Sequence, residues 1–171
     1  MSKLRHYLPK QLLRTLFFSF FQPHIEYCIN IWTCAAKTTL EPIEISMKKA
    51  VRTMSFAKRD AHAAPLFKEF KILNFPKLIE LHLGKLQWVL HNGIYPKFLK
   101  NNLLTENISR ADRQRTINQK FTPLTRTKYK ANFTSSKGQI CWRDIPDNIK
   151  LSKTKKSFYT KFRKHLYNQD T

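Results

Sequence analysis

The chain has 171 residues, and 42% of them are hydrophobic, which is enough to build the packed core of one domain or slightly more. It carries 32 Lys and Arg residues against 11 Asp and Glu residues, and the formal net charge of +21 points to a polyanionic partner. Its three glycines lie far apart and form no GxGxxG or GxxxxGKS/T pattern, which excludes Rossmann-type dinucleotide binding and P-loop nucleotide hydrolysis, and so few glycines argue against a β-sandwich or barrel with many tight turns.

The N-terminal third of the chain predicts a series of helices. Pro9 can open the first, in which apolar residues recur at helical spacing and predict one broad buried stripe. The stripe consists of Leu12, Leu13, Leu16, Phe17, Phe20 and Phe21. Pro23 interrupts this helix and can start a second one, which has four residues on one face: Ile25, Cys28, Ile29 and Trp32.

A third helix follows, with Thr38 or Thr39 as its N-cap. Its inward residues are Leu40, Ile43, Met47, Ala50, Val51 and Met54. The opposite face carries Lys48, Lys49 and Arg52. These three cations form either a solvated face or a ridge that contacts phosphates.

The next segments predict two helices separated by loops. Residues 57–64 form a polar loop, and Pro65 begins a short helix that runs to about Lys71. Pro76 opens a longer helix that stops at Asn92–Gly93. Its expected buried residues are Leu78, Ile79, Leu83, Leu86, Val89 and Leu90.

Two polar residues of that helix, His82 and Gln87, are expected at its edges and are assigned no chemistry. Pro96 then starts a last short turn with Phe98 and Leu99.

Residues 105–137 differ from the rest of the chain. They are rich in Arg, Lys, Thr, Ser and Asn, so we expect a loop or short hairpin that is ordered at best in part. Apolar character returns in a turn around Trp142, and Ile145–Asp147 predicts another turn. Thr154 then caps a basic helix with an apolar stripe and surrounding cations. The stripe is Phe158, Phe162 and Leu166, and the cations are Lys155, Lys156, Lys161, Arg163 and Lys164.

The expected fold is therefore mostly α, a helical bundle with an irregular basic segment and a C-terminal helix. We expect a thumb-like bundle over residues 1–104, a basic connector over 105–137, and a Trp-containing turn with the basic helix over 138–171.

Positive charge is concentrated toward the C-terminus, since residues 109–171 hold 16 basic and 4 acidic residues. Nucleic acid, an acidic membrane surface and no polyanion at all are the alternatives. Aromatic residues between the cations favour nucleic acid, because bases stack on rings while phosphates pair with cations. The candidate nucleic-acid-binding residues are Arg110, Arg113, Arg115, Arg126, Lys128 and Lys130, with Lys48, Lys49 and Arg52 as a second group.

Three aromatic residues of the basic segment, Phe121, Tyr129 and Phe133, either stack on bases or pack against the helical body. If the basic segment does not bind, the Lys48–Arg52 ridge or the Lys155–Lys164 helix is the next candidate.

The cysteines and the apolar stretches suggest no metal site and no membrane span. Three cysteines without a CxxC pair indicate a reducing, intracellular compartment, either nucleus or cytoplasm. His24 and Cys28 stand one helical turn apart, but two ligands do not make a site, so we expect packing and no metal. The apolar stretch from Leu12 to Phe21 contains Arg14 and is too short to span a bilayer.

Short motifs follow one another in a fixed order between residues 3 and 166. They are Gln22–Tyr27, Ile31–Trp32, Lys48–Arg52, Ala61–Phe67, Ile72–Leu73, Arg126–Thr127, Gly138 with Trp142, Ile145–Pro146 and Ser157–Leu166. In this order they resemble the region that follows the polymerase palm in reverse transcriptases of non-LTR retrotransposons of the jockey type. Two positions depart from the family, because Arg143 stands where Asn is usual and Cys28 where Gly is common.

The resemblance implies a helical thumb and C-terminal extension that grips template and primer beside a fingers-palm unit. In the family, the palm holds a Tyr-x-Asp-Asp turn and a third carboxylate, which bind the two metal ions of phosphoryl transfer. This chain has no adjacent pair among its aspartates, which are Asp60, Asp112, Asp144, Asp147 and Asp170. We therefore expect no catalytic residues, no cofactor and no small-molecule substrate.

The sequence thus predicts a non-catalytic, nucleic-acid-binding portion of an RNA-directed DNA polymerase. Its expected partners are RNA or DNA and a fingers-palm unit, and no membrane. The alternative is a retroelement remnant, or a host-captured module, that acts through protein–protein contacts without enzymatic activity. An exposed apolar face would favour this alternative.

The missing carboxylate pair generates a test. The purified chain should incorporate no nucleotide on a primed RNA template with Mg²⁺ or Mn²⁺, because no group can hold two metal ions beside the primer end. The measurement is primer extension against a boiled control. Template-dependent extension above that control would contradict the expected lack of chemistry.

Overall fold

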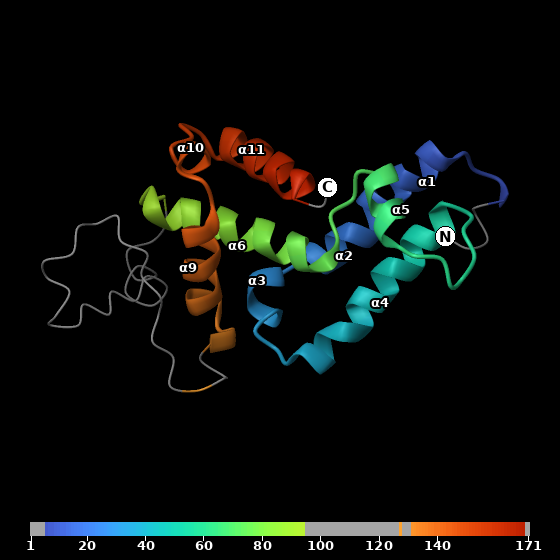
Figure 1. Cartoon of the computed structure of the whole chain (residues 1–171), viewed down its shortest axis with the longest axis horizontal. Coiled ribbons are helices and arrows are strands. Elements are labelled where there is room, and N and C mark those ends of the chain that lie inside the picture. The colour runs from blue at the N-terminus through green and yellow to red at the C-terminus, as the bar shows by residue number, and fades with distance from the viewer. Residues whose placement is uncertain (1–5, 95–126, 128–130, 170–171) are drawn as a thin grey trace, which may run out of the picture. The chain divides into compact units, whose positions relative to one another are not determined.

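Helices make up the regular structure of the part of this protein that is described. A computed structural model of the chain describes residues 6–94, 127 and 131–169, and within these ranges every regular element is a helix (Figure 1). The prediction of a mostly α-helical fold is therefore confirmed.

The helices form two compact units, one made mainly by the chain up to Ile79 and the other by Glu80–Asn168. The boundary lies inside α6 (Phe75–His91). The predicted end of the bundle at residue 104, the turn with Phe98 and Leu99, and most of the predicted connector lie outside the described residues.

The first unit begins with an unbroken helical stretch of three parts, α1 (Lys10–Leu16), the π-helical segment η2 (Phe17–Phe21) and α2 (Gln22–Glu26). The Gln22 N–H donates to the carbonyl of Phe17, five residues back, which is the π-helical pattern. This widened turn comes directly before Pro23, which cannot donate a backbone hydrogen bond. Pro23 therefore stands in the first turn of α2, as predicted, but without a break in the helix.

The predicted stripe of six buried residues is wrong at two positions. Leu13 and Phe17 are fully buried, whereas Leu12 and Phe20 are 50% and 67% exposed. A π turn holds more residues than an α turn, so Phe21 comes to lie over Phe17, with ring centroids 5.1 Å apart. Phe20 consequently falls to the side of the stripe, as Leu12 does.

The predicted second helix is broken at Cys28, where the backbone turns left-handed (φ 51°). The short helix α3 (Ile29–Trp32) starts after this residue. Cys28 is exposed and does not share a buried face with Ile25 and Ile29. Trp32 closes the turn, because its Nε1 donates to the carbonyl of Tyr27 at 2.8 Å.

The helices α4 (Lys37–Met54) and α5 (Ala64–Glu69) complete the first unit. The structure confirms α4 and the short helix at Pro65, but Thr38 and Thr39 lie inside the first turn of α4 and Ala36 is the N-cap. Helix α4 packs against α1 and α5. Arg14 links α1 to the end of α5, because its Nε donates to the carbonyl of Phe70 at 2.7 Å.

Apolar side chains from all these helices meet in one core. It consists of Leu13, Phe17, Ile25, Ile29, Met47, Val51, Met54, Ala63, Phe67, Phe70, Ile72, Phe75 and Leu78.

The second unit contains the remainder of α6, α9 (Thr134–Asp144), α10 (Asp147–Lys150) and α11 (Lys155–Asn168). The predicted connector end at residue 137 and the predicted turn around Trp142 are both wrong, since they fall inside α9. The turn at Ile145–Asp147 is confirmed between α9 and α10. Thr154 caps α11 as predicted, because its Oγ1 accepts a hydrogen bond from the backbone N–H of Ser157 at 3.2 Å.

Two glycines allow the helices of this unit to approach closely. A Cβ on Gly84 of α6 would stand 2.5 Å from Cε1 of Phe162 in α11, and a Cβ on Gly138 of α9 would overlap the Gln87 side chain. Gln87 is therefore fully buried, which corrects its predicted place at the edge of α6. The predicted stripe of α11 is confirmed, with all three members buried: Phe158, Phe162 and Leu166.

The close approach at Gly84 predicts the effect of one methyl group. Gly84→Ala favours the isolated helix by about 1 kcal/mol, but the new Cβ overlaps a buried ring, so we expect a net loss of about 1–3 kcal/mol in the free energy of unfolding. Urea unfolding measures this change. Gly84→Ala should cost less in a Phe162→Leu background than in the parent, because the smaller side chain leaves room for the new Cβ. A Gly84→Ala variant as stable as the parent would refute the close contact.

Candidate nucleic-acid interface

The main cationic group predicted from the sequence lies outside the described residues. This holds for Arg110, Arg113, Arg115, Arg126, Lys128 and Lys130. The second predicted group, Lys48, Lys49 and Arg52, lies on α4 in the first unit. The structure therefore places only the second group.

Two of the three cations of this ridge are already engaged within the chain. The Lys48 Nζ lies 2.6 Å from Oε1 of Glu44, one helical turn earlier. Arg52 donates through Nε to the carbonyl of Ala61 at 2.7 Å and so fixes the loop after α4. Lys49 is exposed. The ridge is thus a mixed surface with one structural arginine, and not a row of three equivalent cations.

Helix α11 offers a more uniform cationic surface. Lys155, Lys156, Lys161 and Lys164 are exposed, and none of them pairs with a carboxylate of a residue that the structure describes. No Asp or Glu stands between Asp147 and Asp170. These lysines therefore keep their charges available to a partner in solution.

The positions of the α11 cations follow from its apolar stripe. Because Phe158 and Phe162 point into the core, Lys161 and Lys164, three residues apart, lie on one side of the outer surface. Lys156 and Arg163, seven residues apart, lie on the other side. Cations thus line both sides of the exposed helix face.

The start of α11 holds positive charge where a helix disfavours it. Lys155 and Lys156 stand in a first turn that has no acidic residue, and exposed Lys153 comes just before the Thr154 cap. The partial positive charge of a helix N-terminus makes cations there unfavourable by about 0.3–1 kcal/mol each. A bound polyanion would relieve this repulsion.

Aromatic rings accompany two of the cations on this surface. The Lys85 Nζ of α6 lies 5.0 Å from the ring centroid of Tyr159. Arg163 lies over the ring of Tyr167 at 5.7 Å, and its Nη2 donates to the Tyr167 hydroxyl at 3.3 Å. These contacts hold the two cations beside the α11 surface.

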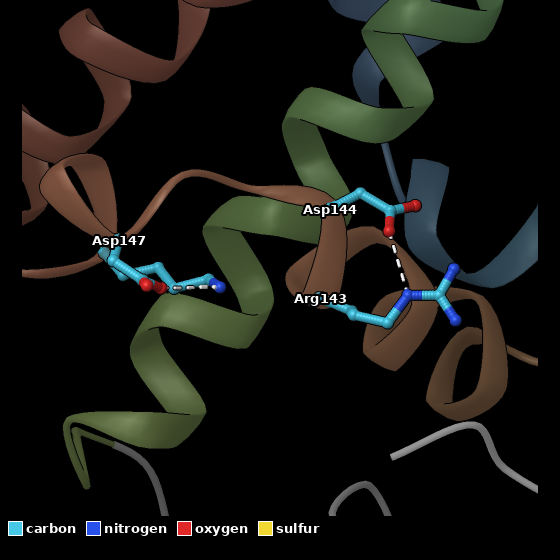
Figure 2. Close-up of polar contacts among 4 residues, drawn as sticks. Arg143, Asp144 and Asp147 are labelled. Carbon is cyan, nitrogen blue, oxygen red and sulfur yellow. Dashed lines mark hydrogen bonds and ion pairs between the residues drawn. The ribbon is translucent and has the colours of Figure 1, made fainter. Parts of the chain in front are cut away.

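The neighbouring α9–α10 junction is different, because its cations pair with acids (Figure 2). Arg143 Nε lies 2.9 Å from Oδ1 of Asp144, and Lys150 Nζ lies 3.1 Å from Oδ1 of Asp147. The contrast singles out α11. In the sequence, the α11 cations are only the next candidate after the basic segment, and the absence of acids from residue 148 to 169 is the signal that favours them.

Cys141 on α9 is a half-buried thiol beside acidic groups. Its Sγ–H donates to the carbonyl of Glu80 at 3.5 Å. Burial, and then the charges of Glu80 and Asp144, raise the pKa of Cys141 to about 12, against a partial opposing effect of a hydrogen bond with the Gly84 backbone. The thiol is therefore protonated at neutral pH, which fits a structural role in packing.

Two other features of the described ranges bear on function. Within them, no three His, Cys, Asp or Glu side chains gather as a metal-binding group. No described helix is both long and apolar enough to cross a bilayer.

No protein-family model, curated protein or solved structure matches this chain. The resemblance to the post-palm region of reverse transcriptases therefore rests on the motifs quoted above.

The pKa of Cys141 predicts slow alkylation. Because the raised pKa keeps the Cys141 thiol almost wholly protonated at pH 8, Cys141 should react with iodoacetamide far more slowly than exposed Cys28, and at a comparable rate only in urea. Mass spectrometry of labelled peptides gives both rates.

The raised pKa of Cys141 also predicts how the free energy of unfolding changes with pH. The folded pKa lies above the value of 9.0 for an unperturbed thiol, so the free energy of unfolding should fall as pH rises from about 9 toward 12. Cys141→Ala should flatten this part of the curve relative to the parent. Equal labelling rates for Cys141 and Cys28 in the folded chain would contradict the burial.

Proposed function

We propose that this chain binds RNA, DNA or their hybrid by phosphate contacts, with the exposed lysines of α11 as its described interface. The observation that carries the proposal is the set of four lysines on α11 without a carboxylate partner among the described residues. The predicted group from Arg110 to Lys130, and exposed Lys49, supply further contacts. Binding of this kind is mostly tolerant of sequence, because phosphates carry no base identity.

The resemblance to the thumb and C-terminal extension of a retrotransposon reverse transcriptase supports the same proposal. In this role the chain grips template and primer, and a separate fingers-palm unit performs nucleotide transfer. The backbone at Cys28 agrees with the family pattern, since φ is 51° at a position where the family commonly has Gly. Glycine adopts that conformation without the cost that a Cβ imposes.

A second candidate function is a protein–protein interaction module without enzymatic activity. The first unit exposes several large apolar side chains, which are Tyr7, Leu12, Phe20, Tyr27, Ile31, Ile45 and Phe56. It also has an apolar cavity of about 420 Å³ between the η2–α2 stretch and α4, lined by Phe20, Pro42 and Ile43 among others. A chain that self-associates and ignores nucleic acid in analytical ultracentrifugation would favour this second function.

The α11 interface predicts a change in the salt dependence of binding. Each phosphate contact contributes about −0.7 to −0.9 to the slope of log K against log salt. Replacing Lys156, Lys161 and Lys164 together by Gln should weaken binding of a single-stranded oligonucleotide and make the slope shallower by about 2–3. Fluorescence anisotropy titrations at several salt concentrations measure both quantities.

A matched control separates local contacts from net charge. Lys37, Lys58 and Lys68 are exposed residues of the first unit, and their joint replacement by Gln removes the same charge. This control variant should lose less affinity than the α11 variant. Its slope of log K against log salt should stay closer to that of the parent. Equal losses in both variants would reduce the α11 interface to a general charge effect, and a loss confined to Arg126→Ala, Lys128→Ala and Lys130→Ala would place binding in the predicted basic segment.

A further inference from the structure

The second unit carries an aromatic pair at its surface. His91, the last residue of α6, stacks on Trp142 of α9 with ring centroids 4.5 Å apart and an interplanar angle of 17°. His91 is exposed and Trp142 is half-buried. Because one face of the imidazole lies against the indole, the opposite face and the ring edge are the parts of the ring left for a ligand.

The imidazole is held in place by a hydrogen bond as well as by stacking. Its Nδ1 lies 2.8 Å from the carbonyl oxygen of Gln87, one turn earlier in α6. A carbonyl can only accept, so Nδ1 carries the proton of this bond. The ring is therefore oriented before any ligand arrives.

Trp142 is backed by the aromatic core of the unit. Its ring centroid lies 6.0 Å from that of Phe158, which in turn lies 5.9 Å from Trp88 and 5.6 Å from Phe162. Phe158 is fully buried on α11. A continuous set of rings thus connects the exposed His91 to the core and makes the stack rigid.

One cation lies beside the Trp142 ring of this stack. Lys150 Nζ lies 5.8 Å from the centroid of the Trp142 ring while pairing with Asp147. Lys155 stands at the start of α11, one helical turn before Phe158. Exposed Lys155 has no carboxylate partner among the described residues and belongs to the interface defined above.

We infer that the face of His91 turned away from Trp142 is a platform on which one base of a single-stranded nucleic acid stacks. Flat aromatic rings, histidine included, bind unpaired bases in this way, and a duplex does not offer a base face to such a platform. Held by Trp142 and the Gln87 carbonyl, the ring loses little freedom on binding, which favours affinity. This inference rests on the proposed function and adds to it a preference for unpaired bases over bare phosphate.

The test compares two strands of equal length and charge, oligothymidylate and an abasic strand with the same backbone. The full chain should bind oligothymidylate more tightly than the abasic strand. His91→Ala should weaken oligothymidylate binding by about 5- to 100-fold and leave the abasic strand unaffected. The slope against log salt should not change, because no phosphate contact is removed.

Two further variants control for folding and for general effects. His91→Phe keeps a flat ring without the hydrogen bond to Gln87 and should retain most of the binding. His62→Ala, at an exposed histidine of the first unit, should behave like the parent. Thermal unfolding checks that both His91 variants are folded.

The outcomes separate this inference from the proposed function. Binding of both strands alike by the parent, with no effect of His91→Ala, overturns the platform and leaves phosphate binding intact. If His91→Ala loses the same affinity for both strands, the platform is also overturned. Binding of neither strand by the parent refutes the proposed function and the platform together.

Discussion

The close approach of α6 to α11 at Gly84 is the contact on which the second unit depends. The absent side chain leaves room for Phe162, and Phe158, one turn earlier on α11, stacks on Trp88 of α6. Once that stripe is buried, the lysines between its members have only the solvent side of the helix to occupy. The position of the cationic surface therefore follows from core packing at Gly84, a residue that carries no charge itself.

The distribution of ion pairs decides which cations of this chain are available to a partner. A charge of +21 spread evenly would act on any polyanion, but this chain neutralises some cations locally and leaves others available. Lys48, Arg143 and Lys150 have acidic partners within one helical turn. The α11 lysines have no such partner among the described residues, so among those residues their charge is the part left available to a polyanion.

The sequence predicts elements that depend on local spacing and fails where distant packing decides. The α11 stripe and its Thr154 cap are visible in the sequence, because both follow from residues within a few turns. The burial of Gln87 depends on Gly138, far along the chain, and the exposure of Phe20 depends on a π turn that no periodicity reveals. Charge density and interleaved aromatic residues select the candidate interface in the sequence, and neither can tell a paired cation from one that is available.

The positions of the tryptophans give each unit its own optical signal. Trp32 stacks on Phe75 in the first unit, while Trp88 and Trp142 belong to the ring cluster of the second, and the chain has no other tryptophan. A chain that keeps only Trp32 reports the melting of one unit, and a chain that lacks only Trp32 reports the other. Intrinsic fluorescence can thus tell whether the two units unfold in one cooperative step or separately, without any added label.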